Sequence, residues 1–263
     1  MASFIIGGIL IVVGVFCSIY FPMRIKNKNI EIQFTQTTPI SELIAILTEN
    51  AKAGLEGYRH YVELKGQTEK DTLQKTPFSE KEVAYYNASL FQVFEEMETY
   101  TDSKGSRHQR LKKSESLMTN QKSTGSIALK DAQSGEKVYI DISQSGLQLD
   151  TLKTLDNFEP VNNMQKYSFF NSIRYNPMGS RTLGFRMIEN TIPLGQSLYV
   201  LGEALLVGAR VNIEKPRDSK KPFIVSVKNE AEIVQGNKTG AKVALVFGIL
   251  LAVAGILVMI FVR

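Results

Sequence analysis

The sequence predicts a membrane-anchored α+β protein that is mainly β. Its central domain is expected to be β-rich, of OB-like or small-barrel type, with a short amphipathic helix, and to lie between two transmembrane helices. Three observations support this fold class. Uninterrupted apolar runs occupy both ends of the chain of 263 residues, Phe4 to Phe21 and Val243 to Val262. Between them, segments rich in β-branched and aromatic residues alternate with turn-forming sequences. One segment near the first run keeps helical spacing.

The two terminal runs have the length and composition of membrane spans. A hydrocarbon core about 30 Å thick needs roughly 20 apolar residues in a helix. The first run lacks the basic start and the small-residue cleavage site of a signal peptide, which favours an uncleaved anchor. The second run holds no charged, amide or hydroxyl side chain, so it has no face suited to water.

Basic residues on the inner flanks of the runs predict the orientation. Arg24, Lys26 and Lys28 follow the first run, and Lys238 and Lys242 precede the second. Lys and Arg near span ends stay on the cytoplasmic side, so we expect residues 24 to 242 in the cytoplasm and both termini across the membrane. Short loops and the missing transit peptide favour a bacterial inner membrane; an organelle envelope is the alternative.

Small residues recur along one stripe of each run. Such stripes let helices approach closely in lipid, and we expect the spans to pack on each other, within one chain or between copies as a homo-oligomer. The candidate packing residues are Gly7, Gly14, Ser18, Ala244, Gly248 and Ala252.

The chain therefore divides into four parts: a span over 4–21, a juxtamembrane segment over 24–56, a β-rich domain over 57–234 and a span over 243–262. In the second part, Thr38 and Pro39 predict the N-cap and first position of a helix from Ile40 to about Lys52, with Gly54 at its C-terminus. Docking of this helix on its own domain is favoured over the bilayer surface, because its polar face is poor in Lys and Arg.

Four segments of the third part have the pattern of strands: 61–67, 138–142, 198–203 and 223–227. The segment from Val83 to Val93 fits both helical and strand spacing, so periodicity alone leaves its structure open. Glu95 and Glu96 are neighbours, and on a strand their side chains would point to opposite faces, which argues against a shared acid and base site.

Composition limits the chemistry. Cys17 is the single cysteine and lies inside the first run, and His60 and His108 are the two histidines. No zinc ribbon, disulfide or exposed thiol catalyst can be built from these, and no metal, cofactor or catalytic residue is predicted. The two histidines are expected to be structural or surface residues, since no base-orienting motif accompanies them. A net charge of +5 and a pI of about 9.1 fit a segment facing anionic lipid.

The most charged feature is a loop expected from Lys104 to Lys122. It lacks interleaved aromatic residues, so no nucleic-acid partner is predicted. A solvated hairpin between strands is favoured over contact with anionic membrane lipid. The residues that would face the lipid are Lys104, Arg107, Arg110, Lys112 and Lys113.

Several motifs together resemble one family. They are Tyr61-Val62-Glu63-Leu64-Lys65-Gly66, Thr76-Pro77-Phe78-Ser79, Val83-Ala84-Tyr85-Tyr86, Arg181-Thr182-Leu183-Gly184-Phe185 and the run from Ile192 to Glu203. In this combination the chain is similar to the GIDE ("beside a membrane") domain of mitochondrial and chloroplast outer-envelope E3 ubiquitin ligases and of related bacterial proteins. The run from Ile192 to Glu203 is the most specific part.

The resemblance implies a strand for Val83 to Val93. It also implies ubiquitin transfer by a zinc-bound RING, but a RING needs zinc ligands that this chain does not supply, and we expect a RING-less, non-catalytic member. We therefore expect a protein-interaction or scaffold module with an unknown protein partner. A regulatory subunit of a ligase is the alternative, and a membrane-anchored hydrolase with an unrecognised site is a weaker one.

Overall fold

The computed structural model describes residues 2–69, 74–166 and 181–261. Its helices are α1 (Ala2–Phe34), α2 (Ile40–Lys52) and α3 (Glu230–Phe261), with a 3-10 helix over Val161–Lys166. Its strands are β1 (Arg59–Glu69), β2 (Gln74–Lys75), β3 (Glu82–Thr101), β4 (Arg107–Lys122), β5 (Ser126–Lys130), β6 (Lys137–Asp141), β7 (Leu147–Asp150), β8 (Leu152–Pro160), β9 (Arg181–Pro193), β10 (Ser197–Val207), β11 (Arg210–Glu214) and β12 (Phe223–Ser226).

The fold class is as predicted. A mainly β central region of the small-barrel kind, with a short amphipathic helix, lies in the sequence between two long apolar helices. These helices, over Phe4–Phe34 and Glu230–Phe261, are long and apolar enough to cross a membrane. The chain forms two compact units: Met1–Lys65, Gln144–Leu149 and Leu198–Arg263 make the first, and Gly66–Ser143 and Asp150–Ser197 the second.

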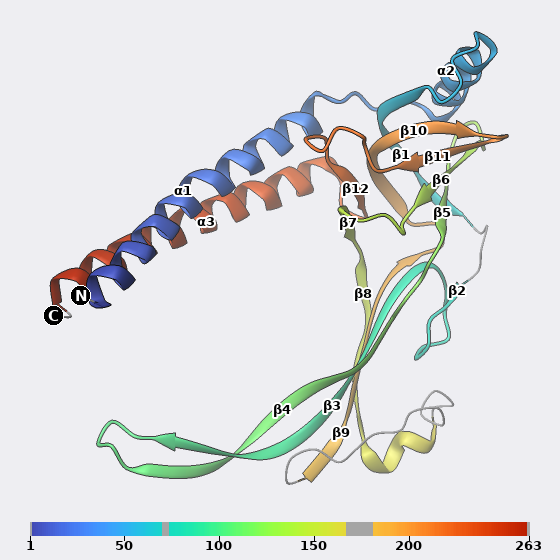
Figure 1. Cartoon of the computed structure of the whole chain (residues 1–263). Helices are drawn as coiled ribbons and strands as arrows, with labels where there is room; N and C mark the ends of the chain where they lie inside the picture. Colours follow the sequence, from blue (N-terminus) through green and yellow to red (C-terminus); the bar gives the residue numbers. More distant parts are fainter. Residues whose placement is uncertain (1, 70–73, 167–180, 262–263) are drawn as a thin grey trace. The chain divides into compact units, whose positions relative to one another are not determined.

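In the first unit, α1 and α3 pack side by side along most of their length (Figure 1). At 1.5 Å per residue, the 33 residues of α1 extend about 50 Å, which is more than a bilayer core requires. Both helices therefore continue past their apolar runs. Ile32 near the end of α1 and Ile233 near the start of α3 join a buried cluster with residues of β10 and β12, including Tyr199, Leu201 and Ile224.

The short helix α2 also belongs to the first unit. It covers the predicted range, and its apolar residues Ile40, Leu43 and Leu47 are buried, which confirms that it docks on the fold. Gly54 has φ of 82°, the left-handed conformation expected after a helix end. The predicted N-cap was wrong: Pro39 occupies that position, and the backbone N–H of Thr38 donates to the carbonyl of Glu63 in β1 instead.

In the second unit, an antiparallel sheet follows the order β2-β3-β9-β8. β4 pairs with the edge of β3 that faces away from β9. Val83 to Val93 lies within β3, so the strand implied by the family resemblance is confirmed. The buried core of this sheet is formed by Phe78, Ala88, Leu90, Phe185 and Met187.

The four strand segments predicted from pattern correspond to β1, β6, β10 and β12.

The predicted loop from Lys104 to Lys122 was wrong. Residues Arg107–Lys122 form β4, a strand of 16 residues, and only the short stretch before it is a turn. Its side chains are mostly exposed and polar, so the strand lacks the apolar alternation that reveals a half-buried strand. Its partner β3 supplies the compensating carboxylates.

Candidate functional site

The outer part of the β3–β4 hairpin is an exposed feature of the second unit. β3 pairs with β9 only as far as Glu95, whereas its pairing with β4 continues to Thr101 and Arg107. Among the described residues, the stretch beyond Glu95 is therefore a ribbon of two strands. Figure 1 shows this ribbon, twisted and extended, reaching past the end of β9. A ribbon of two strands is marginally stable in water without further contacts.

The turn at the tip of the ribbon is well organised. One carboxylate oxygen of Asp102 accepts hydrogen bonds from the backbone N–H groups of Lys104 and Ser106, both at 2.9 Å. The other carboxylate oxygen lies 2.9 Å from Nε2 of His108. The hydrogen bond from His108, with help from the backbone N–H of Ser106, lowers the pKa of Asp102. His108 thus has a structural position in the turn, and His60 lies beside the Tyr58 hydroxyl, 3.3 Å from its oxygen.

The two faces of the ribbon differ because side chains alternate along each strand. On one face, Glu98 pairs with Arg110 at 2.7 Å and with Lys112 at 2.9 Å. The guanidinium of Arg110 also lies 5.1 Å from the centre of the Tyr100 ring. Lys112 and Arg110 together lower the pKa of Glu98. This face is a network of opposite charges around one aromatic ring.

The other face of the ribbon carries an exposed apolar pair. Met97 and Leu111 are directly opposite each other on β3 and β4, and their exposed fractions are 53% and 60%. Further along β4 and on the same face by alternation, Leu117 is 55% exposed. Met97 and Leu111 therefore form one contiguous apolar spot on the ribbon, and Leu117 stands apart from them on the same face.

The outer edge of β4 adds a second property. In the described sheet β4 has β3 on one side and no strand on the other. An edge of this kind presents backbone N–H and C=O groups that can pair with another extended chain. The ribbon therefore combines an open backbone edge with apolar side chains from its own two strands.

The basic residues that the sequence singled out as lipid-facing are all on or beside this ribbon, but they do not share one face. Lys104 lies in the turn and Arg107 begins β4. Arg110 and Lys112 are paired with Glu98. Lys113 points to the opposite face, with its ammonium 5.1 Å from the centre of the Phe158 ring in β8. Lipid contact by this set stays a prediction.

Five of the small residues singled out in the two spans lie at the contact between α1 and α3: Gly7, Gly14, Ser18, Gly248 and Ala252. A Cβ added to Gly14 would come 2.6 Å from the carbonyl oxygen of Gly248 and 2.7 Å from the amide nitrogen of Ala252. Ser18 is also close to Gly248, and its hydroxyl donates to the Gly14 carbonyl at 2.8 Å. A Cβ on Gly7 would come 2.6 Å from the carbonyl oxygen of Gly255. Ala244 lies one turn before Gly248 on α3.

Two features were missed from sequence. Gly255 was not selected, although it follows Gly248 by seven residues just as Gly14 follows Gly7, a spacing that keeps residues on one side of a helix. The pairs Gly7 with Gly255 and Gly14 with Gly248 also show that the helices run antiparallel. Met97 and Leu111 were missed because each is an isolated apolar residue among charges, and only the strand register places them together.

No group of three or more His, Cys, Asp or Glu side chains in the described residues is arranged to hold a metal ion. Two buried carboxylates have structural partners instead. Glu189 accepts hydrogen bonds from the backbone N–H groups of Phe78 and Ser79, at 2.8 and 3.1 Å. Glu63 accepts from the hydroxyl of Tyr199 at 2.9 Å and pairs with Lys65 at 3.0 Å.

Two long apolar helices and a β-rich region with an exposed hairpin define a class of membrane-associated proteins built around a β domain. A family model described as GIDE, E3 ubiquitin ligase, matches residues 95–260. Because the match covers more than half of the chain, the protein belongs to the GIDE family. The match includes the motifs from Arg181 to Glu203 and begins after those from Tyr61 to Tyr86. No curated protein and no solved structure matches the chain.

Proposed function

We propose that this chain is a membrane-held recognition module that binds an extended segment of a protein partner along the outer edge of β4, and that it acts as a non-catalytic scaffold. The observation that carries the proposal is the exposed pair Met97 and Leu111 beside an edge strand without a second neighbour in the described sheet. Main-chain pairing would supply affinity, and the apolar side chains would select the partner. The segment contacted would therefore alternate apolar residues with polar ones.

The test uses photocrosslinking in the native membrane. A photoreactive amino acid replaces Leu111 in the full chain, and the matched control carries it at Leu55, another leucine that is more than half exposed but lies outside the strands. We expect a discrete crosslinked partner from position 111 and none from position 55. Equal labelling from both positions would rule out β4 as the recognition edge.

A second arm tests the apolar pair. Met97→Ser together with Leu111→Ser removes two exposed apolar side chains without altering the ion pairs on the opposite face. With the photoreactive residue moved to Leu117, we expect the crosslink yield to fall about tenfold, since partly burying two such side chains contributes on the order of 1–2 kcal/mol. An unchanged yield would show that the pair takes no part in binding.

The family supports a second candidate, because the matching family model is described as an E3 ubiquitin ligase. In this case the chain would be a regulatory subunit that brings its β domain to a separate catalytic chain. Mass spectrometry of the crosslinked partner distinguishes the two candidates. A RING-bearing protein would support the regulatory subunit, and envelope proteins without a RING would support the scaffold.

We also propose that the module faces the cytoplasm from a bacterial inner membrane. The basis is the group of basic residues at the inner ends of the two spans, Arg24, Lys26, Lys28, Lys238 and Lys242. The small residues of α1 and α3 are engaged with each other within one chain, and we propose that their role is this intrachain packing.

A further inference from the structure

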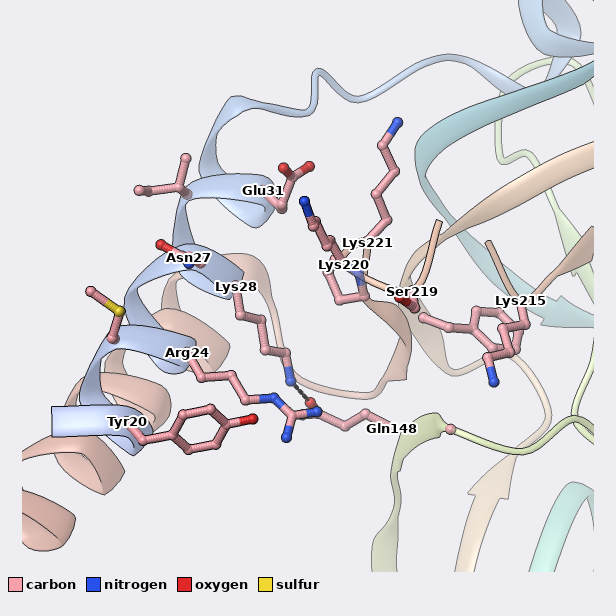
Figure 2. Close-up of a pocket in the computed structure, with 15 residues that line it drawn as sticks. Tyr20, Arg24, Asn27, Lys28, Glu31, Gln148, Lys215, Ser219, Lys220 and Lys221 are labelled. Atoms are coloured by element: carbon pink, nitrogen blue, oxygen red, sulfur yellow. Dashed lines mark hydrogen bonds between the residues drawn. The ribbon is translucent and has the colours of Figure 1, made fainter. Parts of the chain in front are cut away.

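The first unit contains a pocket that the recognition edge does not use. Its cavity measures about 800 Å³ and is formed between the polar end of α1 and the segment that joins β11 to β12, with a contribution from the start of β7. Figure 2 shows the α1 side chains along one wall and Lys215, Ser219, Lys220 and Lys221 along the other. All of these residues belong to one compact unit.

The pocket is strongly positive. Five basic side chains line it, and Glu31 is its single carboxylate; the basic residues are Arg24, Lys28, Lys215, Lys220 and Lys221. Like charges that line one cavity repel each other, and this arrangement favours an anionic occupant that compensates them. Arg24 offers a planar guanidinium that can hold two oxygens of a phosphate, and the lysines offer compact point charges.

The lysine segment is held in place by its own contacts. The backbone N–H of Lys220 donates to the Asp218 carboxylate at 2.9 Å, and that of Lys221 donates to the Asp218 carbonyl at 3.0 Å. The ammonium of Lys221 lies 4.6 Å from the centre of the Tyr61 ring. Burial raises the pKa of Tyr61, so its hydroxyl stays protonated and donates to the Pro222 carbonyl at 3.0 Å. The second wall of the pocket is therefore built before any ligand arrives.

The position of the pocket along α1 indicates where its ligand comes from. Tyr20 lines the pocket and belongs to the last turn of the apolar run, and Arg24 follows one turn later. The headgroup layer of a bilayer begins where such a run ends, and it extends roughly 5–8 Å beyond the hydrocarbon on each side. Apolar side chains, including Met23 and Ile30, line the same pocket, so an occupant can carry an apolar part along α1 and a charged part towards the lysines.

We propose that this pocket binds the phosphate groups of an anionic lipid headgroup, with Arg24, Lys215 and Lys220 as the principal phosphate ligands. Lys28 contributes from α1, where it now donates to the Gln148 side chain. The acyl chains of the lipid stay in the bilayer beside Tyr20. This inference is independent of the recognition edge on β4, because the two sites lie in different units.

The experiment uses the full chain in nanodiscs of phosphatidylcholine that contain a small fraction of a multiply phosphorylated inositol lipid with a photoreactive headgroup. We expect saturable labelling, and peptide mapping should place the label in residues 215–223 and at the polar end of α1. Labelling spread evenly over the basic residues next to the spans would overturn the site.

Two variants that each lose three charges distinguish a site from a general basic surface. The first variant carries Arg24→Gln, Lys215→Gln and Lys220→Gln, which remove the side chains proposed to hold the phosphate. The second variant carries Lys26→Gln, Lys238→Gln and Lys242→Gln, which remove the same number of charges from a separate groove between α1 and α3. Only the first set lines the pocket and can make charge-assisted hydrogen bonds to a phosphate there, so we expect the first variant to weaken labelling at least tenfold and the second about twofold or less. Equal losses would contradict a built site. Circular dichroism confirms that both variants fold.

A last arm separates lipid from free phosphate. Soluble inositol polyphosphate is added to the same nanodiscs as a competitor of the photoreactive lipid. We expect competition only at concentrations far above that of the lipid, because the soluble compound lacks the apolar part that follows α1. Competition at equal concentration would show that the pocket takes a soluble phosphate compound, which would overturn the lipid as its ligand.

Discussion

Glu189 illustrates how this chain uses a buried carboxylate for structure. Its side chain is fully buried, and it accepts hydrogen bonds from two backbone N–H groups in the turn after β2. The same turn contains Glu80, the one described residue other than glycine with positive φ, at 54°. A left-handed residue in a turn costs free energy, and the carboxylate offsets that cost by satisfying donors that the turn leaves unpaired.

We predict that Glu189→Ala lowers the free energy of unfolding by about 1–3 kcal/mol, because two buried N–H donors lose their acceptor. Chemical denaturation of the full chain in detergent, followed by circular dichroism, measures this loss. Glu136→Ala is the control, since Glu136 is exposed in the turn between β5 and β6. A loss of stability as small as that of the control would show that the turn does not depend on Glu189.

Asp156 gives a prediction about pH. Arg186, with Lys153, lowers the pKa of Asp156, and the carboxylate lies 2.7 Å from the Arg186 guanidinium and 3.0 Å from the Lys153 ammonium. A depressed pKa in the folded state means that the contribution to stability is present above the usual Asp value of about 3.9 and is lost as pH falls below it. We predict that Asp156→Asn flattens the fall of stability below about pH 4. An unchanged acid profile would contradict a stabilising pair.

At the scale of elements, the helix pair depends on residues without a side chain. The close approach of α1 to α3 at Gly14 and Gly248 leaves no room for a methyl group, because both carbonyl oxygens point into the contact. In lipid the hydrophobic effect does not hold helices together, so this close packing provides the attraction instead. Asn29 of α1 accepts a hydrogen bond from Asn237 of α3 at 2.8 Å, beyond the apolar runs.

We predict that Gly14→Ala destabilises the helix pair by about 1–3 kcal/mol, the usual cost of overpacking. Gly8→Ala in the same span is the matched control, because a Cβ there meets only the Met259 methyl group, at 3.6 Å. Thermal unfolding of the full chain in detergent compares the two variants. If both unfold at the same temperature, the contact between α1 and α3 is not as close as the structure has it.

Whether an element could be predicted from the sequence depends on whether it buries one face. Segments that bury one face, such as β6 and α2, were predictable because burial imposes a period on the apolar residues. β4 was not, since Arg107–Lys122 buries little and the partners of its charges, among them Glu98, lie on another strand. The exposed pair Met97 and Leu111 likewise depends on register, which no local pattern specifies.

For the whole molecule, the antiparallel pairing of α1 and α3 has a direct consequence. Gly7 near the start of α1 lies against Gly255 near the end of α3, so the start of α1 and the end of α3 lie at the same end of the helix pair (Figure 1). If both helices cross one membrane, the termini share one side and the segment between the helices is on the other. The proposal that this segment faces the cytoplasm rests on the basic residues at the inner ends of the spans.

The most direct test of the membrane-held module maps the two sides of the membrane. The full chain carries one tag at each terminus and a third after Gly105, in the turn of the β3–β4 hairpin, and protease is added outside spheroplasts. We predict that both terminal tags are lost while the hairpin tag is protected until the membrane is opened. Protected termini with a cleaved hairpin tag would contradict the orientation. Release of the chain by alkaline carbonate, or termini on opposite sides, would contradict two spans in one membrane.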